Sequence, residues 1–149
     1  MEIWEKFDKK INTKELKDGI KQARENGGGN YEEVPYGTYE VNVEKIELRE
    51  SKKGDPMVSI WFNIIAGNFK NSKIFYNQVI NQGFQIHLLN EFLRSLDTGV
   101  NVEFDSYAQY NEVLMDVAEG TKTLEYALKY GENKKGFPTY EIIEVFEAE

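Results

Sequence analysis

The chain has 149 residues, a formal net charge of -8 and no cysteine. This length favours one domain that can bury a core without disulfides, and the lack of cysteine excludes thiolate metal sites and a cysteine nucleophile. We see no leader at the start and no stretch near the ~20 apolar residues of a membrane span. The expected location is therefore the cytoplasm.

Residues 1–30 are predicted to form an N-terminal helix and linker, separate from a domain at residues 31–149. Asn12-Thr13-Lys14-Glu15 is typical of a helix start, and apolar residues then recur at helical spacing as far as Ala23. Three glycines at positions 27–29 should end this helix and form a flexible linker. A phosphate-binding loop would need a preceding strand and a Lys-Ser/Thr ending, and both are missing.

Three strands are predicted next. Over residues 38–49, apolar and polar side chains alternate, but the alternation slips by one residue after Glu44, which predicts a β-bulge and a bent strand. Pro56 opens a second strand at about residues 57–66, and a third is expected at residues 74–80.

Residues 82–120 are predicted to be a helical insert. Apolar residues at three- and four-residue steps indicate a helix from Phe84 to Leu96, with Gly99 at its end, and a second helix at about residues 106–119, which Gly120 stops. The segment holds one Arg against seven Asp or Glu, so most of the acidity of the chain lies here.

Two strands at about residues 122–130 and 140–146 complete the chain. Three strands, a helical insert and two more strands, with a long bent first strand, are the plan of the OB-fold, a five-stranded Greek-key barrel. We therefore expect a mainly β, α+β domain of this type. Other small barrels with five strands are the alternative.

Two predicted hairpin tips carry nearly the same letters, namely Lys52-Lys53-Gly54-Asp55-Pro56 and Lys134-Lys135-Gly136-Phe137-Pro138. Ordinary polar turns have this composition too. In an OB-fold, however, these loops border the face of strands 2 and 3 that an oligonucleotide crosses. Lysine pairs at both tips favour a clamp for a polyanion.

The strands between the tips carry rings on which bases could stack. Trp61 has polar neighbours on its face of the second strand, although burial against the insert or a partner would also explain it. Tyr76 and Gln78 share a face that we expect to point outward, and Phe137 is either a stacking ring or a plug for its loop. The predicted DNA-binding residues are Lys45, Arg49, Lys52, Lys53, Trp61, Lys73, Tyr76, Gln78, Lys134, Lys135 and Phe137.

Signals for an enzyme are weak. His87 is the sole histidine and falls in the apolar stripe of the first insert helix, where a half-buried structural role is expected. A transition-metal site would need further His or Cys ligands, and the acidic residues show no spacing typical of a Mg²⁺ nuclease. We therefore expect a binding protein without catalytic residues, metal or cofactor.

Four segments resemble a family of bacteriophage single-stranded-DNA-binding proteins, long catalogued as phage proteins of unknown function: residues 33–41, 51–57, 77–80 and 83–87. The resemblance covers about residues 30–97. It implies an OB-fold that coats single-stranded DNA during phage replication and recombination in the host cytoplasm, through the Lys52-Lys53 loop and the face of strands 2 and 3. Partner proteins of phage or host replication and recombination, or further copies of the chain, fit this role.

The acidic insert supports a different interpretation, in which the chain is a protein-binding inhibitor or DNA mimic that blocks a host nucleic-acid enzyme. The insert would then be the active face. Salt separates the two hypotheses, because a single-strand binder loses affinity steeply as salt rises.

Overall fold

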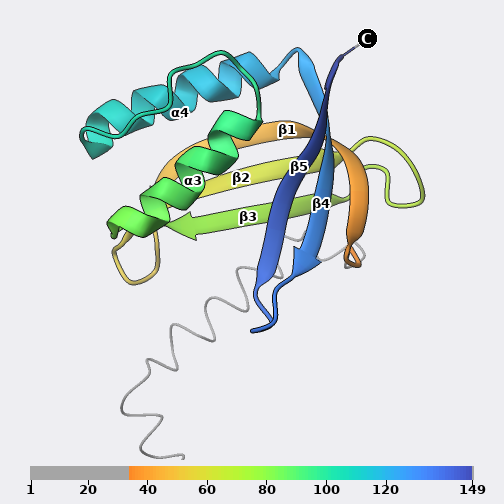
Figure 1. Ribbon diagram of the computed structural model, residues 1–149, viewed down its shortest axis with the longest axis horizontal. Helices are drawn as coiled ribbons and strands as arrows, with labels where there is room; N and C mark the ends of the chain where they lie inside the picture. The colour runs from red at the N-terminus through yellow and green to blue at the C-terminus, as the bar shows by residue number, and fades with distance from the viewer. Residues whose placement is uncertain (1–33, 149) are drawn as a thin grey trace, which may run out of the picture.

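The structure is a computed structural model that describes residues 34–148 (Figure 1). The N-terminal helix and glycine linker predicted for residues 1–30 lie outside the described residues. Five antiparallel strands form one open sheet in the order β3-β2-β1-β4-β5, and two helices follow β3. The elements are β1 (Gly37–Glu50), β2 (Pro56–Ile64), β3 (Lys73–Val79), α3 (Gly83–Ser95), α4 (Tyr107–Thr121), β4 (Leu124–Glu132) and β5 (Pro138–Glu147). The predicted α+β class is confirmed.

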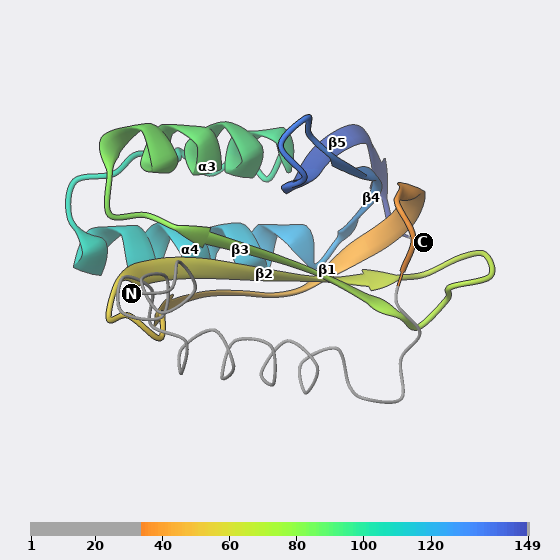
Figure 2. The same ribbon diagram turned by 90° about the horizontal axis from the view of Figure 1, so that it is seen from below.

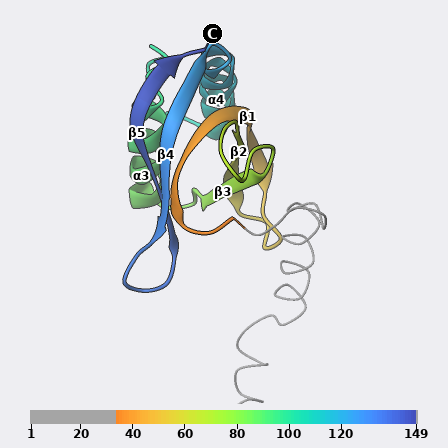
Figure 3. The same ribbon diagram turned by 90° about the vertical axis from the view of Figure 1, so that its right-hand side faces the viewer.

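The long first strand bends at the predicted bulge. Its second part pairs with β2 and its first part with β4, and the register against β2 shifts between Val43 and Lys45, which leaves Glu44 as the extra residue. A bulge increases twist and lets one strand turn through a large angle. Figure 3 shows β1 curving from its place beside β2 toward β4. The bend allows a single strand to hold both halves of the sheet.

The core lies between the sheet and the two helices. Val58, Ile60, Phe62 and Ile64 of β2 are fully buried, as their alternation predicts. In Figures 1 and 2, α3 lies across the sheet near β3, while α4 runs beside β1. The helices contribute the buried residues Leu89, Phe92 and Leu93 from α3, and Tyr110, Val113, Leu114 and Val117 from α4.

The two glycines placed at the helix ends behave differently. α3 ends at Ser95, one residue before the predicted end at Leu96, and both Asp97, with a φ of 55°, and Gly99, with a φ of 80°, take the left-handed conformation in the loop that follows. α4 begins where predicted, after the cap Ser106, but it continues through Gly120. A Cβ at position 120 would lie 2.7 Å from Thr98 Cβ. This glycine therefore permits a close approach of the preceding loop instead of stopping the helix.

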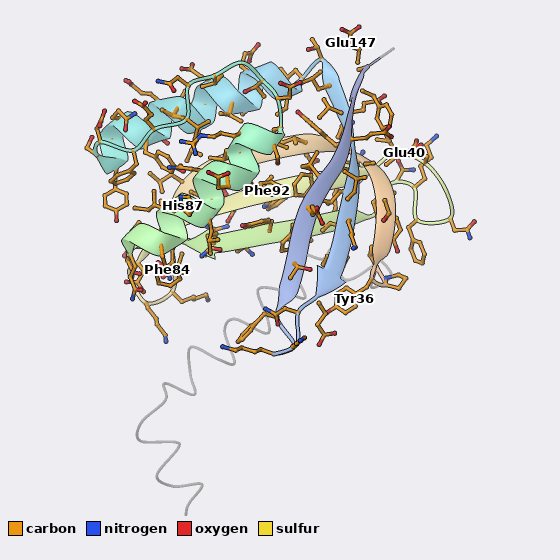
Figure 4. All side chains as sticks on the ribbon, viewed as in Figure 1. Tyr36, Glu40, Phe84, His87, Phe92 and Glu147 are labelled. Atoms are coloured by element: carbon orange, nitrogen blue, oxygen red, sulfur yellow. The ribbon has the colours of Figure 1, made fainter. Side chains whose placement is uncertain are left out.

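The apolar stripe of α3 is wider than its buried part. Phe92 is buried, whereas Phe84 and Leu88 are 62% and 54% exposed, and His87 is also exposed. Figure 4 shows Phe84 and His87 along the first half of α3, with Phe92 further along toward β5. The half-buried structural role predicted for His87 is wrong, because α3 packs on the sheet along a different line.

Candidate functional site

An aromatic pair occupies the sheet face opposite the helices. Trp61 lies between two core residues of β2, so its side chain points to this outer face, where Lys45 of β1 and Phe75 of β3 are its cross-strand partners. The rings of Trp61 and Phe75 meet edge to face with centroids 5.1 Å apart, and Lys45 Nζ is 4.3 Å from the centroid of the Trp61 ring. A cation over an indole in a partly exposed site stabilises the arrangement by ~0.5–1 kcal/mol. Trp61 is half-buried and held in a fixed orientation.

The predicted cations on this face each have a carboxylate partner. Lys45 and Arg49 both contact Glu47, at 3.5 and 3.6 Å, and Lys73 lies 2.9 Å from Glu44, the bulge residue. Exposed pairs such as these add little to stability. They do cancel charge, so the outer face around Trp61 is close to neutral.

The two hairpin tips have the same backbone structure. The N–H of Ser51 donates to the carbonyl of Asp55 at 2.8 Å, and the N–H of Gly54 donates back to the carbonyl of Ser51 at 2.9 Å. The same two bonds occur in the second tip at 2.9 and 3.0 Å, with Asn133 in the place of Ser51. The repeated letters in the sequence thus form a repeated turn.

Side chains complete both turns in the same way. Ser51 Oγ accepts a hydrogen bond of 3.0 Å from the N–H four residues later, and Asn133 Oδ1 accepts the equivalent bond, also 3.0 Å long. Gly54 and Gly136 both have a φ of 86°, a left-handed conformation that glycine adopts without steric cost. Each tip is therefore held by its first residue and its glycine, and the lysine side chains take no part in it.

The lysines at both tips are free to meet a ligand. Lys52, Lys53, Lys134 and Lys135 are exposed, and none has an ion-pair partner within residues 34–148. In Figures 1 and 3 the β1–β2 and β4–β5 tips extend from the same, lower side of the domain. The two pairs of cations are thus displayed on one side of an acidic protein.

Each tip also has a feature of its own. The first is tied to the start of the helical insert, because Asn81 Nδ2 donates to Asp55 Oδ1 at 3.2 Å and the N–H of Ile80 donates to the carbonyl of Pro56 at 2.9 Å. The second carries Phe137, whose side chain is 63% exposed. Phe137 is therefore not a buried plug for its loop.

The structure corrects the orientation of Tyr76. We expected it to point outward beside Trp61, but it is 9% exposed and its ring packs against Phe92 and Tyr140, with centroids 4.9 and 4.3 Å away. The alternation within β3 does not indicate which face points into the core, because apolar residues occur on both faces. Phe75, which lies on the opposite face of β3 from Tyr76, is the ring beside Trp61, as the register between β2 and β3 shows.

Tyr76 and Gln78 line a groove between α3, β3 and the start of β5, with a volume of about 740 Å³. Phe137 joins them there, so three of the predicted site residues meet at this groove and away from Trp61. Burial raises the pKa of Tyr76 and of Tyr140 above the ordinary value for tyrosine. The lining residues are Tyr76, Asn77, Gln78, Leu88, Glu91, Phe92, Ser95, Phe137, Pro138, Thr139, Tyr140, Glu141 and Ile142.

Among residues 34–148 there is no group of three or more His, Asp or Glu side chains that could hold a metal ion. Neither α3 nor α4 combines the length and the apolar character that a membrane-crossing helix requires.

Comparison with known proteins gives a family for the chain. Residues 20–132, well over half of the sequence, match the model of a family described as "Protein of unknown function (DUF669)". No curated protein matches the chain. The match includes β1, β2, β3, both helices and β4, so it covers four of the five strands and the first lysine tip, whereas β5 lies outside it. The chain therefore belongs to the DUF669 family.

Proposed function

We propose that the protein binds single-stranded DNA without strong sequence preference, on a domain that is an OB-fold barrel left partly open. The strand order supports this fold: β1 pairs with both β2 and β4 through a bulge, and the helices lie between β3 and β4. An OB-fold has the same connectivity and uses the loops that follow its first and fourth strands to flank an oligonucleotide.

The observation that carries the proposal is the pair of matching turns with free lysines. Phosphate binding requires cations that are not already neutralised, since the favourable term is the release of counterions from the nucleic acid. Lys52, Lys53, Lys134 and Lys135 meet this requirement within residues 34–148, whereas Lys45, Arg49 and Lys73 are paired with carboxylates. The tips are therefore the primary contacts for the DNA backbone.

Trp61 supplies a ring for base stacking. Stacking of a base on an aromatic side chain contributes ~1–3 kcal/mol, more than the ~0.5–1 kcal/mol of the cation–π contact that Lys45 makes with the same ring. A base can thus replace the Lys45 ammonium on Trp61, while that ammonium keeps its ion pair with Glu47. Because every base has a π-face, this contact does not select a sequence.

The resemblance of residues 30–97 to bacteriophage single-stranded-DNA-binding proteins supports the same role. A protein of this kind covers exposed strands during DNA replication and recombination in the cytoplasm of the host. It needs no catalytic group, metal or cofactor.

Charge reversal at the tips tests the proposal. Three double variants change the net charge by the same amount: K52E/K53E, K134E/K135E and the control K122E/K129E, whose lysines lie outside the tips. With a fluorescent oligo-dT in low salt, we expect each tip variant to bind at least about ten-fold more weakly and to show a shallower salt dependence. The control should stay within about two-fold of the wild type. Equal binding by all three variants, or no retention of oligo-dT by the wild type, would sink the proposal.

A second candidate function is a protein-binding inhibitor or DNA mimic. It is favoured by the insert, in which all seven acidic residues are exposed: Glu91, Asp97, Glu103, Asp105, Glu112, Asp116 and Glu119. This function predicts no binding of oligo-dT at any salt concentration. It also predicts that the wild type, but not an E112K/D116K variant, prevents a DNA-processing enzyme from binding its substrate.

A further inference from the structure

The two edges of the open sheet meet at the groove. β3 and β5 end the strand order, and no backbone pairing joins them in the part of the chain that the structure describes. The groove is lined by residues 76–78 of β3 and residues 138–142 of β5, with α3 as its third wall. Unpaired strand edges are ready templates for a further strand.

The β3 edge directs backbone groups toward this space. The Tyr140 hydroxyl of β5 donates to the carbonyl of Phe75 at 2.7 Å, so the Phe75 carbonyl points away from β2 and toward β5. In an antiparallel strand, the backbone groups of alternate residues point to the same side. The N–H and C=O of Asn77 therefore point into the groove, where they can pair with an added strand.

The walls of the groove suit apolar side chains on that strand. Leu88 is 54% exposed and Phe137 is 63% exposed, and both line the groove together with the ring of Tyr140. Side chains of a bound strand alternate between the two faces, so every second residue can reach these apolar walls. Packing within the domain leaves the side chains of Leu88 and Phe137 largely exposed, so both are available to a bound strand.

The charge of the groove selects a partner with positive charge. Its lining contains the carboxylates of Glu91 and Glu141, both exposed, and no Lys or Arg. Arg94 pairs with Oε1 of Glu91 at 2.9 Å, whereas Glu141 has no ion-pair partner within residues 34–148, so the lining keeps a net negative charge. An anionic rim repels phosphates and attracts ammonium groups, which argues against DNA as the occupant.

We propose that this groove binds an extended peptide segment of a partner protein, in which apolar and basic residues alternate. The segment adds to the β3 edge as a strand, places its apolar side chains against Leu88 and Phe137, and directs its basic side chains to Glu91 and Glu141. This is recognition by strand addition, in which backbone hydrogen bonds give affinity and side-chain contacts give specificity. The groove adjoins the second lysine tip, whose Phe137 and Pro138 belong to its lining, but none of the four tip lysines lines it.

Synthetic peptides test the proposal on the 149-residue chain. The probe is a fluorescent, end-capped peptide of about seven alternating valine and lysine residues, and its comparison peptide has glutamate in place of lysine. We expect the lysine peptide to bind at least about ten-fold more tightly. N-methylation of every second residue should remove most of that affinity. Equal binding by the methylated peptide would refute strand addition.

Matched variants separate the groove from the general acidity of the protein. E91K/E141K and E112K/D116K change the net charge equally, but the second pair lies on α4, away from the groove lining. The first should weaken binding of the lysine peptide about ten-fold and the second by less than about two-fold. A similar loss in both variants would show that binding depends on net charge alone.

An L88D variant separates a peptide from DNA as the occupant. Leu88 is an exposed side chain of α3, so this variant should keep the thermal stability of the wild type. It should lower the affinity for the lysine peptide about ten-fold and leave the affinity for oligo-dT within about two-fold. A parallel loss of oligo-dT binding would make the groove part of the DNA site and overturn the proposal.

Discussion

The Tyr140 hydroxyl donates a 2.7 Å hydrogen bond to the backbone carbonyl of Phe75, and so joins the two edges of an otherwise open sheet. The ring of Tyr140 also lies on that of Tyr76, with centroids 4.3 Å apart. One side chain thus positions β5 against β3 and sets the width of the groove between them.

Removal of this hydroxyl should destabilise the protein. Tyr140→Phe leaves the ring contacts in place but takes the donor from the Phe75 carbonyl, and we expect a loss of about 1 kcal/mol in the free energy of unfolding. Urea unfolding followed by fluorescence measures it. Tyr76→Phe is the matched control, because the Tyr76 hydroxyl makes no hydrogen bond within residues 34–148. If both variants unfold at the same urea concentration, the hydrogen bond does not tie the edges.

A methyl group at position 120 should destabilise the protein although alanine favours helices. The Cβ of Gly120→Ala would lie 2.7 Å from Cβ and 3.1 Å from Cγ2 of Thr98. Overpacking of this kind costs ~1–3 kcal/mol, which exceeds the gain of ~1 kcal/mol from helix propensity. We expect a lower thermal midpoint for Gly120→Ala. Gly83→Ala is the control, since nothing lies within 4 Å of its added Cβ, and an equal change in both would exclude the contact with Thr98 as the cause.

The two tip glycines should respond alike to substitution. Gly54 and Gly136 share a φ of 86°, a conformation that costs an L-residue such as alanine ~1–2 kcal/mol. Gly54→Ala and Gly136→Ala should therefore each destabilise the fold by about 1 kcal/mol in urea unfolding. Asparagine tolerates this backbone conformation better, so the Asn variants should lose less. Alanine variants as stable as the asparagine variants would contradict the shared turn.

Alkaline pH should unfold the protein through its buried tyrosines. Burial raises the pKa of Tyr110, Tyr126 and Tyr140 well above the ordinary value of about 10. The folded state then keeps phenolic protons that the unfolded chain releases. The stability from these groups is complete below about pH 10 and falls as the pH rises toward the folded pKa values. Urea unfolding at a series of pH values from 8 upward measures this, and Tyr126→Phe should flatten the decline. Stability that does not change above pH 10 would contradict it.

The parts of the fold with local sequence signals were predictable. The slip in alternation at Glu44 and the helix start near Ser106 depend on residues within their own elements, and both features occur as expected. The direction of Tyr76 was not predictable, because β3 is apolar on both faces and its register depends on β2. The role of Gly120 was also hidden, since it depends on Thr98, which the chain brings against α4 only after folding.

In the candidate site, too, the features with local sequence signals were predictable and those that depend on contacts between elements were not. The matching letters around Lys52 and Lys134 predicted two tips, and each tip is a turn at the expected place. The strand residues were assigned to faces by alternation alone, which separated Trp61 from its true neighbour Phe75. Contacts across strands depend on the register of the strands, and the groove depends on how α3 packs on β3 and β5. No local sequence pattern encodes either of these.

The construction of the two tips makes their charge independent of their shape. Ser51 and Asn133, together with one glycine in each turn, make the side-chain and left-handed contributions that the two turns share, and the lysine side chains make none. The charge of the two tips can therefore be changed, by substitution of the lysines or by chemical modification of their amines, without a change in the backbone structure of the hairpins. In evolutionary terms, the number of cations that the tips display can change at almost no cost in stability.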